Sequence, residues 1–105
     1  MEKYAWRAKI VEGKREEYIE RHNRIWTEMI VALKQAGICN YTIWENNGEL
    51  FGYYECKKGI DFAVKVQNES DVVERWNEYM KDVLIMEMDS VTGAQPKLEK
   101  VFELE

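Results

Sequence analysis

The chain has 105 residues, 46% of them hydrophobic and 33% charged, a globular profile with enough apolar mass for one domain over residues 1–105 and no second one. Its net charge of −5 argues against nucleic acid or an anionic membrane surface as the natural partner. No apolar run is long enough to cross a bilayer and no hydrophobic signal segment opens the chain, so we expect a cytoplasmic protein.

The first third of the chain predicts a strand followed by a long helix. Residues 4–11 are rich in aromatic and β-branched side chains and roughly alternate, which is typical of a strand that ends at Gly13. Over residues 14–35 the apolar side chains recur at helical intervals, with Gly37 as a stop signal. The polar run at residues 22–24 favours a break or kink within this helix.

The middle of the chain predicts a β-hairpin. Residues 38–45 and 49–56 alternate, and Asn47-Gly48 between them suits the positive φ angles of a type I′ turn. A two-residue turn there would place Cys39 opposite Cys56. Reduced thiols are the expectation for a cytoplasmic chain, and a disulfide between these cysteines is the alternative.

The last third predicts two helices and a closing strand. Residues 61–66 are typical of a short helix, and residues 71–86 of a longer one with Asp71 as its N-cap. Gly93 and Pro96 mark a loop, after which residues 98–104 alternate as a fourth strand.

The resulting order, β-α-β-β-α-β, is the ferredoxin-like α+β arrangement with an antiparallel sheet. Both helical segments would cover one face of the sheet and leave the other face bare. Since the strands carry many aromatic side chains that need burial, we expect a homodimer in which two sheets close a barrel.

His22 is the only histidine, and Tyr18 precedes it by four residues. On a helix this spacing directs a phenol and an imidazole to the same face. Histidine can both give and take a proton near neutral pH, so His22 is the first candidate for proton chemistry. A structural role for a lone histidine is the alternative.

Four separated motifs, in the same order and nearly the same numbering, resemble the L-rhamnose mutarotase family. They are Glu17-Tyr18-x-x-Arg21-His22-Asn23-x-Ile25-Trp26-x-Glu28, Asn40-Tyr41-x-Ile43, Arg75-Trp76-x-x-Tyr79-Met80-x-Asp82-Val83 and Glu99-x-Val101-Phe102-x-Leu104.

The resemblance implies roles for five residues. His22 occupies the position of the family's proton donor, and Tyr18 and Tyr41 occupy those of two tyrosines that contact the substrate. The family has two adjacent tryptophans on its second long helix. Here Trp76 matches the first, and Asn77 stands in place of the second, so a polar amide replaces one sugar-stacking surface.

The activity implied by the resemblance is the interconversion of the α and β anomers of L-rhamnose. Opening and reclosing a hemiacetal ring requires an acid and a base but no metal and no redox cofactor. The second proton-transfer group is not identified by the motifs. Glu17, Glu20 and Glu28 lie nearby in sequence, and we expect their side chains to face solvent.

Three other functions fit parts of the pattern. The preferred substrate could be another deoxy sugar such as L-fucose, because Asn77 departs from the family. A ferredoxin-like dimer could also bind a sugar without catalysis, since such folds host many roles. A cofactor-free monooxygenase is the third alternative, and the polar Tyr-His-Asn cluster argues against it.

Overall fold

The computed structural model describes residues 1–86 and 97–104. In chain order its elements are β1 (Glu2–Ile10), α1 (Arg15–Asn23), α2 (Thr27–Gln35), β2 (Ile38–Asn46), β3 (Glu49–Cys56), α3 (Ile60–Glu69), α4 (Asp71–Met80) and β4 (Leu84–Ile85). None of the helices in these residues is both long and apolar enough to span a bilayer.

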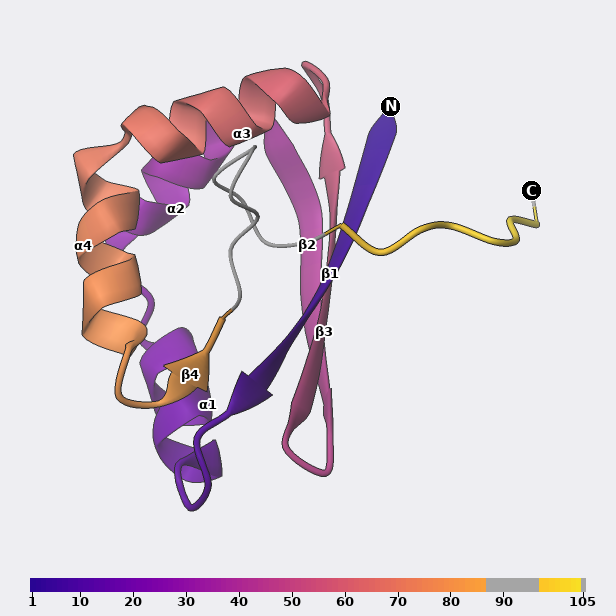
Figure 1. Ribbon diagram of the computed structural model, residues 1–105. Coiled ribbons are helices and arrows are strands. Elements are labelled where there is room, and N and C mark those ends of the chain that lie inside the picture. The colour runs from indigo at the N-terminus through magenta and orange to yellow at the C-terminus, as the bar shows by residue number, and fades with distance from the viewer. Residues whose placement is uncertain (87–96, 105) are drawn as a thin grey trace.

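The four strands form one antiparallel sheet in the order β2-β3-β1-β4. Two helical crossovers connect its strands, α1 and α2 between β1 and β2, and α3 and α4 between β3 and β4. All four helices lie on the same side of the sheet (Figure 1). The predicted ferredoxin-like α+β class is therefore confirmed.

Strand alternation separates a buried face of the sheet from an open one. Along β1 the side chains of Tyr4, Trp6, Ala8 and Ile10 are buried toward the helices, and their neighbours are more exposed. Because successive side chains of a strand point to opposite faces, the aromatic residues at positions 4 and 6 necessarily share the covered face.

The predicted hairpin is present, and its turn is of the expected kind. Asn47 and Gly48 both have positive φ angles, 52° and 83°, as a type I′ turn requires. The register expected from this turn holds as far as Thr42, which pairs with Tyr53.

A β-bulge then shifts the register by one residue, between Cys39 and Thr42. Cys39 consequently pairs with Glu55 rather than with Cys56, so the prediction that the two cysteines face each other is wrong. Both are free thiols.

The helical predictions hold in outline and differ at the ends. The break expected in the first long helix is confirmed, because Trp26 is extended (φ −61°, ψ 137°) at the start of α2. The short helix is longer than predicted and runs from Ile60 to Glu69. Ser70, not Asp71, is the N-cap of α4, since its side chain accepts a hydrogen bond from the Val73 amide.

The prediction for the fourth strand is wrong. The second long helix stops at Met80, and the strand beside β1 is Leu84–Ile85. Of the C-terminal segment, Lys97 forms an isolated bridge with Trp6, and residues 98–104 are not a strand. They leave the sheet on the side away from the helices (Figure 1). An alternating pattern indicates that one face of a segment is buried, but it does not show whether the same chain or a second chain covers that face. The predicted loop at Gly93 and Pro96 lies outside the described residues.

Candidate active site

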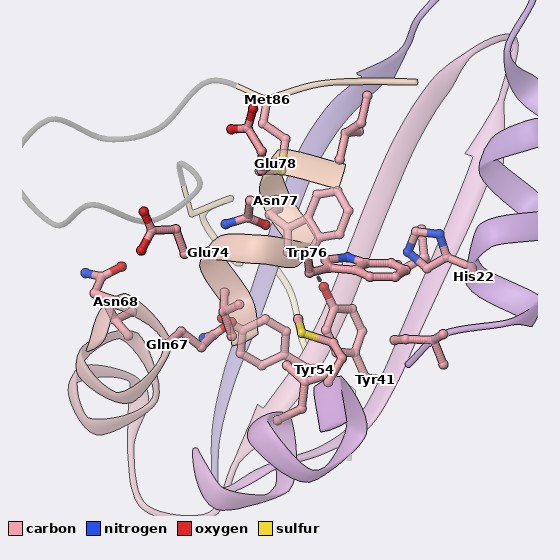
Figure 2. A pocket seen from close by; sticks show the side chains of 18 of the residues that line it. His22, Tyr41, Tyr54, Gln67, Asn68, Glu74, Trp76, Asn77, Glu78 and Met86 are labelled. Atoms are coloured by element: carbon pink, nitrogen blue, oxygen red, sulfur yellow. Dashed lines mark hydrogen bonds between the residues drawn. The ribbon is translucent and has the colours of Figure 1, made fainter. Parts of the chain in front are cut away.

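A cavity of about 690 Å³ opens between the covered face of the sheet and the two helical crossovers. This volume is within the usual range for small-molecule sites. All five residues singled out from the sequence line it: Tyr18, His22, Tyr41, Trp76 and Asn77. Figure 2 shows His22 at one end, Trp76 and the two tyrosines Tyr41 and Tyr54 in the middle, and polar side chains at the other end.

His22 is held by its own helix. Its Nδ1 lies 3.2 Å from the backbone oxygen of Tyr18, one turn earlier in α1. Since a carbonyl oxygen only accepts, this hydrogen bond places the imidazole proton on Nδ1 and leaves a lone pair on Nε2. Burial lowers the pKa of His22, and the bond to Tyr18 opposes this shift without reversing it. His22 is therefore neutral near pH 7, with Nε2 as a potential base.

Two aromatic rings contact the imidazole. The Tyr18 ring lies 4.3 Å from it, centroid to centroid, and the Trp76 ring lies 5.5 Å away with an edge-on geometry. Tyr18 is itself buried, and this burial raises the pKa of its phenol. These contacts restrict the rotation of the imidazole ring, which fixes the direction of Nε2.

Tyr41 reaches the cavity because of the bulge in β2. Ile38 faces the helices, and strict alternation would turn residue 41 to the open face. The bulge inserts one residue, with Asn40 in the left-handed region at φ 51°. This returns Tyr41 to the covered face, where it receives a hydrogen bond of 3.1 Å from the indole Nε1 of Trp6. β-Bulges often redirect a side chain in this way beside functional sites.

Trp76 and Asn77 come from α4. Trp76 is buried, with Trp26 and Tyr79 at centroid distances of 5.2 and 5.6 Å. Asn77 lies beyond it in the polar end of the cavity, with Gln67 and Glu74 (Figure 2). The indole and the amide thus present an apolar and a polar surface to the same cavity.

Arg21, next to His22, ties α1 to the segment after α4. Its guanidinium forms two hydrogen bonds to Asp82, at 2.7 and 3.1 Å, and one to the backbone oxygen of Tyr79. It also lies 4.5 Å from the centre of the Tyr79 ring. The pair lowers the pKa of Asp82. This arginine clamp holds the helix that carries His22 against the helix that carries Trp76.

Comparison with known proteins identifies the family. The profile of the L-rhamnose mutarotase family matches residues 3–104. The chain belongs to the L-rhamnose mutarotase family. It is 37% identical to an L-rhamnose mutarotase of Burkholderia ambifaria over 107 aligned positions that cover both chains completely. It is 38% identical to one of Sinorhizobium fredii, with 99% of each chain covered.

The fold agrees with a solved member of the same family. The crystal structure of an L-rhamnose mutarotase from Formosa agariphila superimposes with a TM-score of 0.79 at 25% sequence identity, and the match covers the whole of both chains. The resemblance in the four sequence motifs therefore extends to the architecture that carries them.

Three residues of the cavity lining were not predicted from the sequence. Trp6, Tyr54 and Gln67 were not singled out as site residues, yet all three line the cavity. For Trp6 and Tyr54 the available signal was strand alternation, which places residues two apart on the same face. In the structure Trp6 pairs with Gly52, and Tyr54 lies two residues further along β3 on the same covered face.

The carboxylates near His22 in sequence lie outside the cavity, as expected. Glu17, Glu20 and Glu28 are exposed and pair with Arg21, Arg24 and Arg75. In the part of the chain that the structure describes, no three His, Cys, Asp or Glu side chains gather closely enough to bind a metal ion.

Proposed function

We propose that this protein interconverts the α and β anomers of L-rhamnopyranose, the activity for which its family is named. The observation that carries the proposal is the state of His22. It is a neutral imidazole whose Nε2 has no hydrogen-bond partner among the described residues, in a cavity lined by phenols and indoles. The chain matches the family over residues 3–104. Phenols bind sugar hydroxyls, and aromatic faces pack against the C–H groups of a 6-deoxy sugar.

Ring opening breaks the bond between C1 and the ring oxygen. The hydroxyl on C1 loses its proton as the aldehyde forms, and the ring oxygen gains one. After rotation about the C1–C2 bond, reclosure to either face yields either anomer. In our proposal Nε2 of His22 accepts one proton, and the resulting imidazolium donates it back during closure. Water can supply or accept the proton at the other oxygen. One acid–base group of this kind typically raises the rate about 10²–10⁴-fold.

The remaining side chains are proposed to orient the sugar. Tyr18 and Tyr41 hold hydroxyl groups, because burial raises the pKa of both phenols and keeps them protonated. Trp76 provides an apolar plate for the methyl group and C–H face. Asn77 offers an amide to a sugar hydroxyl at the polar end. Because this amide replaces a stacking surface of the family, the preference among deoxy sugars is tested with both L-rhamnose and L-fucose.

The test is anomer exchange measured by NMR on L-rhamnose and L-fucose. We expect the wild type to exceed the buffer rate and His22→Ala to lose about 10²–10⁴-fold of that acceleration. Glu20→Ala, an exposed substitution on the same helix, is the matched control and should retain it, with folding checked by circular dichroism. Exchange at the buffer rate for both sugars would contradict the proposal. Binding without acceleration would identify a non-catalytic sugar-binding protein.

We also propose that the protein is a cytoplasmic homodimer. Trp44 on β2 and Phe51 on β3 are cross-strand partners on the open face of the sheet, and Trp44 is 69% exposed. Val101 and Phe102 in the C-terminal segment are 93% and 77% exposed. Apolar surface of this kind usually marks an interface, and a second copy of the chain would cover both. The two free thiols are the form cysteines keep in a reducing compartment.

A further inference from the structure

Trp6 lines the cavity, and its indole ring occupies space that a glycine on the neighbouring strand leaves open. Its side chain is only 2% exposed, and it lies across Gly52, its partner on β3. A Cβ atom at position 52 would be 1.9 Å from Cε2 of the indole. No residue other than glycine leaves room for this ring, so the sequence at position 52 preserves the position of the indole at position 6.

The contact that this arrangement creates is directional. The indole N–H of Trp6 can only donate, and it does so to the Tyr41 hydroxyl at 3.1 Å. A phenol has one proton and two acceptor lone pairs. The oxygen of Tyr41 therefore accepts from Trp6, and its own proton must point elsewhere. No residue in ranges 1–86 and 97–104 accepts that proton in a hydrogen bond with Tyr41, which lines the cavity.

We infer that Trp6 is a positioning residue, whose indole N–H fixes the Tyr41 hydroxyl so that its proton is directed to an acceptor oxygen of the bound sugar. The inference rests on the proposed function and deepens it. Tyr41 becomes a hydrogen-bond donor, and the sugar oxygen opposite it must accept. Without Trp6 the phenol could rotate its hydrogen away or accept a hydrogen bond from the sugar, and both lose part of the binding contact.

The substitution Trp6→Phe tests this directly, because it keeps an aromatic ring and removes the N–H. We expect KM for L-rhamnose to rise about 3- to 10-fold, the worth of one hydrogen bond, with kcat little changed. A purely structural role would reduce the amount of folded enzyme, which lowers the apparent kcat and leaves KM alone.

A double-mutant cycle separates the hydrogen bond from packing. If Trp6 acts through Tyr41, then Trp6→Phe should have no further effect on KM in a Tyr41→Phe protein. Ile10→Val is the control, since it removes buried volume from the same face of β1 and is not part of the cavity lining. It should lower the unfolding midpoint without changing KM.

An NMR measurement on the Tyr41→Phe protein tests the inference even if the Trp6→Phe variant does not fold. In the Tyr41→Phe protein, the indole proton resonance of Trp6 should move upfield, while those of Trp26, Trp44 and Trp76 stay close to their wild-type positions. An unchanged Trp6 resonance, or an equal KM rise in both backgrounds of the cycle, overturns the inference and leaves the proposed function standing. A wild type that neither binds nor converts the sugar overturns both.

Discussion

The chemistry available to His22 depends on where its ring lies. Its spacing from Tyr18 was enough to predict the pairing, because residues four apart on a helix share a face. Its charge state was not predictable, since this depends on burial by Trp76 from a different helix. Trp6 illustrates the same limit, because its hydrogen bond to Tyr41 depends on a partner 35 residues away in the sequence.

The pH dependence of catalysis should reflect the lowered pKa of His22. The ordinary pKa is 6.5 and the folded value lies below it, so the neutral form predominates at neutral pH. Protonation removes the Nε2 lone pair as the pH falls through the folded pKa. We expect kcat/KM for anomer exchange to be level at neutral pH and above and to decline on the acid side, when measured by NMR from about pH 5 to 8.

The control for this profile is the buffer-catalysed rate, subtracted at each pH. A decline with its midpoint above 6.5 would contradict the assignment of a desolvated histidine base. A direct titration of the imidazole resonances should give the same midpoint as the kinetic profile in the free enzyme.

At the scale of elements, the β2–β3 hairpin was predictable up to the point where strict alternation fails. Asn47-Gly48 indicates the turn, and alternation predicts the register that follows from it. The bulge at residue 40 was missed, because apolar side chains occupy both even and odd positions of this strand (Ile38, Cys39, Tyr41, Ile43 and Trp44), so the change of face leaves no clear break in the pattern. The identity of residue 40 was the available clue, since asparagine is among the few non-glycine residues that adopt positive φ readily.

Asn40 should therefore tolerate glycine and reject a β-branched residue. We expect Asn40→Gly to keep the bulge and near wild-type affinity. Asn40→Val should destabilise the protein by about 1–3 kcal/mol, because valine is strained at positive φ. It should also raise KM, since relief of that strain turns Tyr41 away from the cavity. Urea unfolding and exchange kinetics measure the two effects.

A matched control is Thr42→Val, an exposed position on the same strand with ordinary geometry. It should change neither quantity appreciably. If Asn40→Val were as stable and as active as Asn40→Gly, the bulge would not be what directs Tyr41.

At the scale of the whole molecule, the order of elements was enough to predict the ferredoxin-like sheet, because few topologies accommodate that order. The position of the last strand was not predictable. Residues 98–104 alternate like a strand, but among the described residues their one backbone hydrogen bond to β1 is that of the Leu98 amide to the Ala5 oxygen. Glu103 reaches β1 only through its side chain, which pairs with Lys3. An alternating segment whose apolar side chains stay exposed is what a strand completed by a second chain would look like.

The substitution Phe102→Asp tests that interpretation. We expect the wild type to have the mass of a dimer by light scattering, and the variant to shift toward the monomer because a charge would be buried at the interface. Glu99→Gln, an exposed change in the same segment, should leave the mass unchanged. A monomeric wild type, or a variant of unchanged mass, would contradict the proposed assembly.

The arginine clamp has a consequence for a ligand that carries no charge. The packing of α1 against α4, which both supply residues to the cavity wall, depends in part on the ion pair of Arg21 with Asp82, whose carboxylate is largely exposed. Mobile ions weaken such pairs. Affinity for a neutral sugar should then fall as ionic strength rises, although no charge on the sugar is screened. Salt would then lower the affinity by loosening the packing of two helices, and so by changing the shape of the cavity.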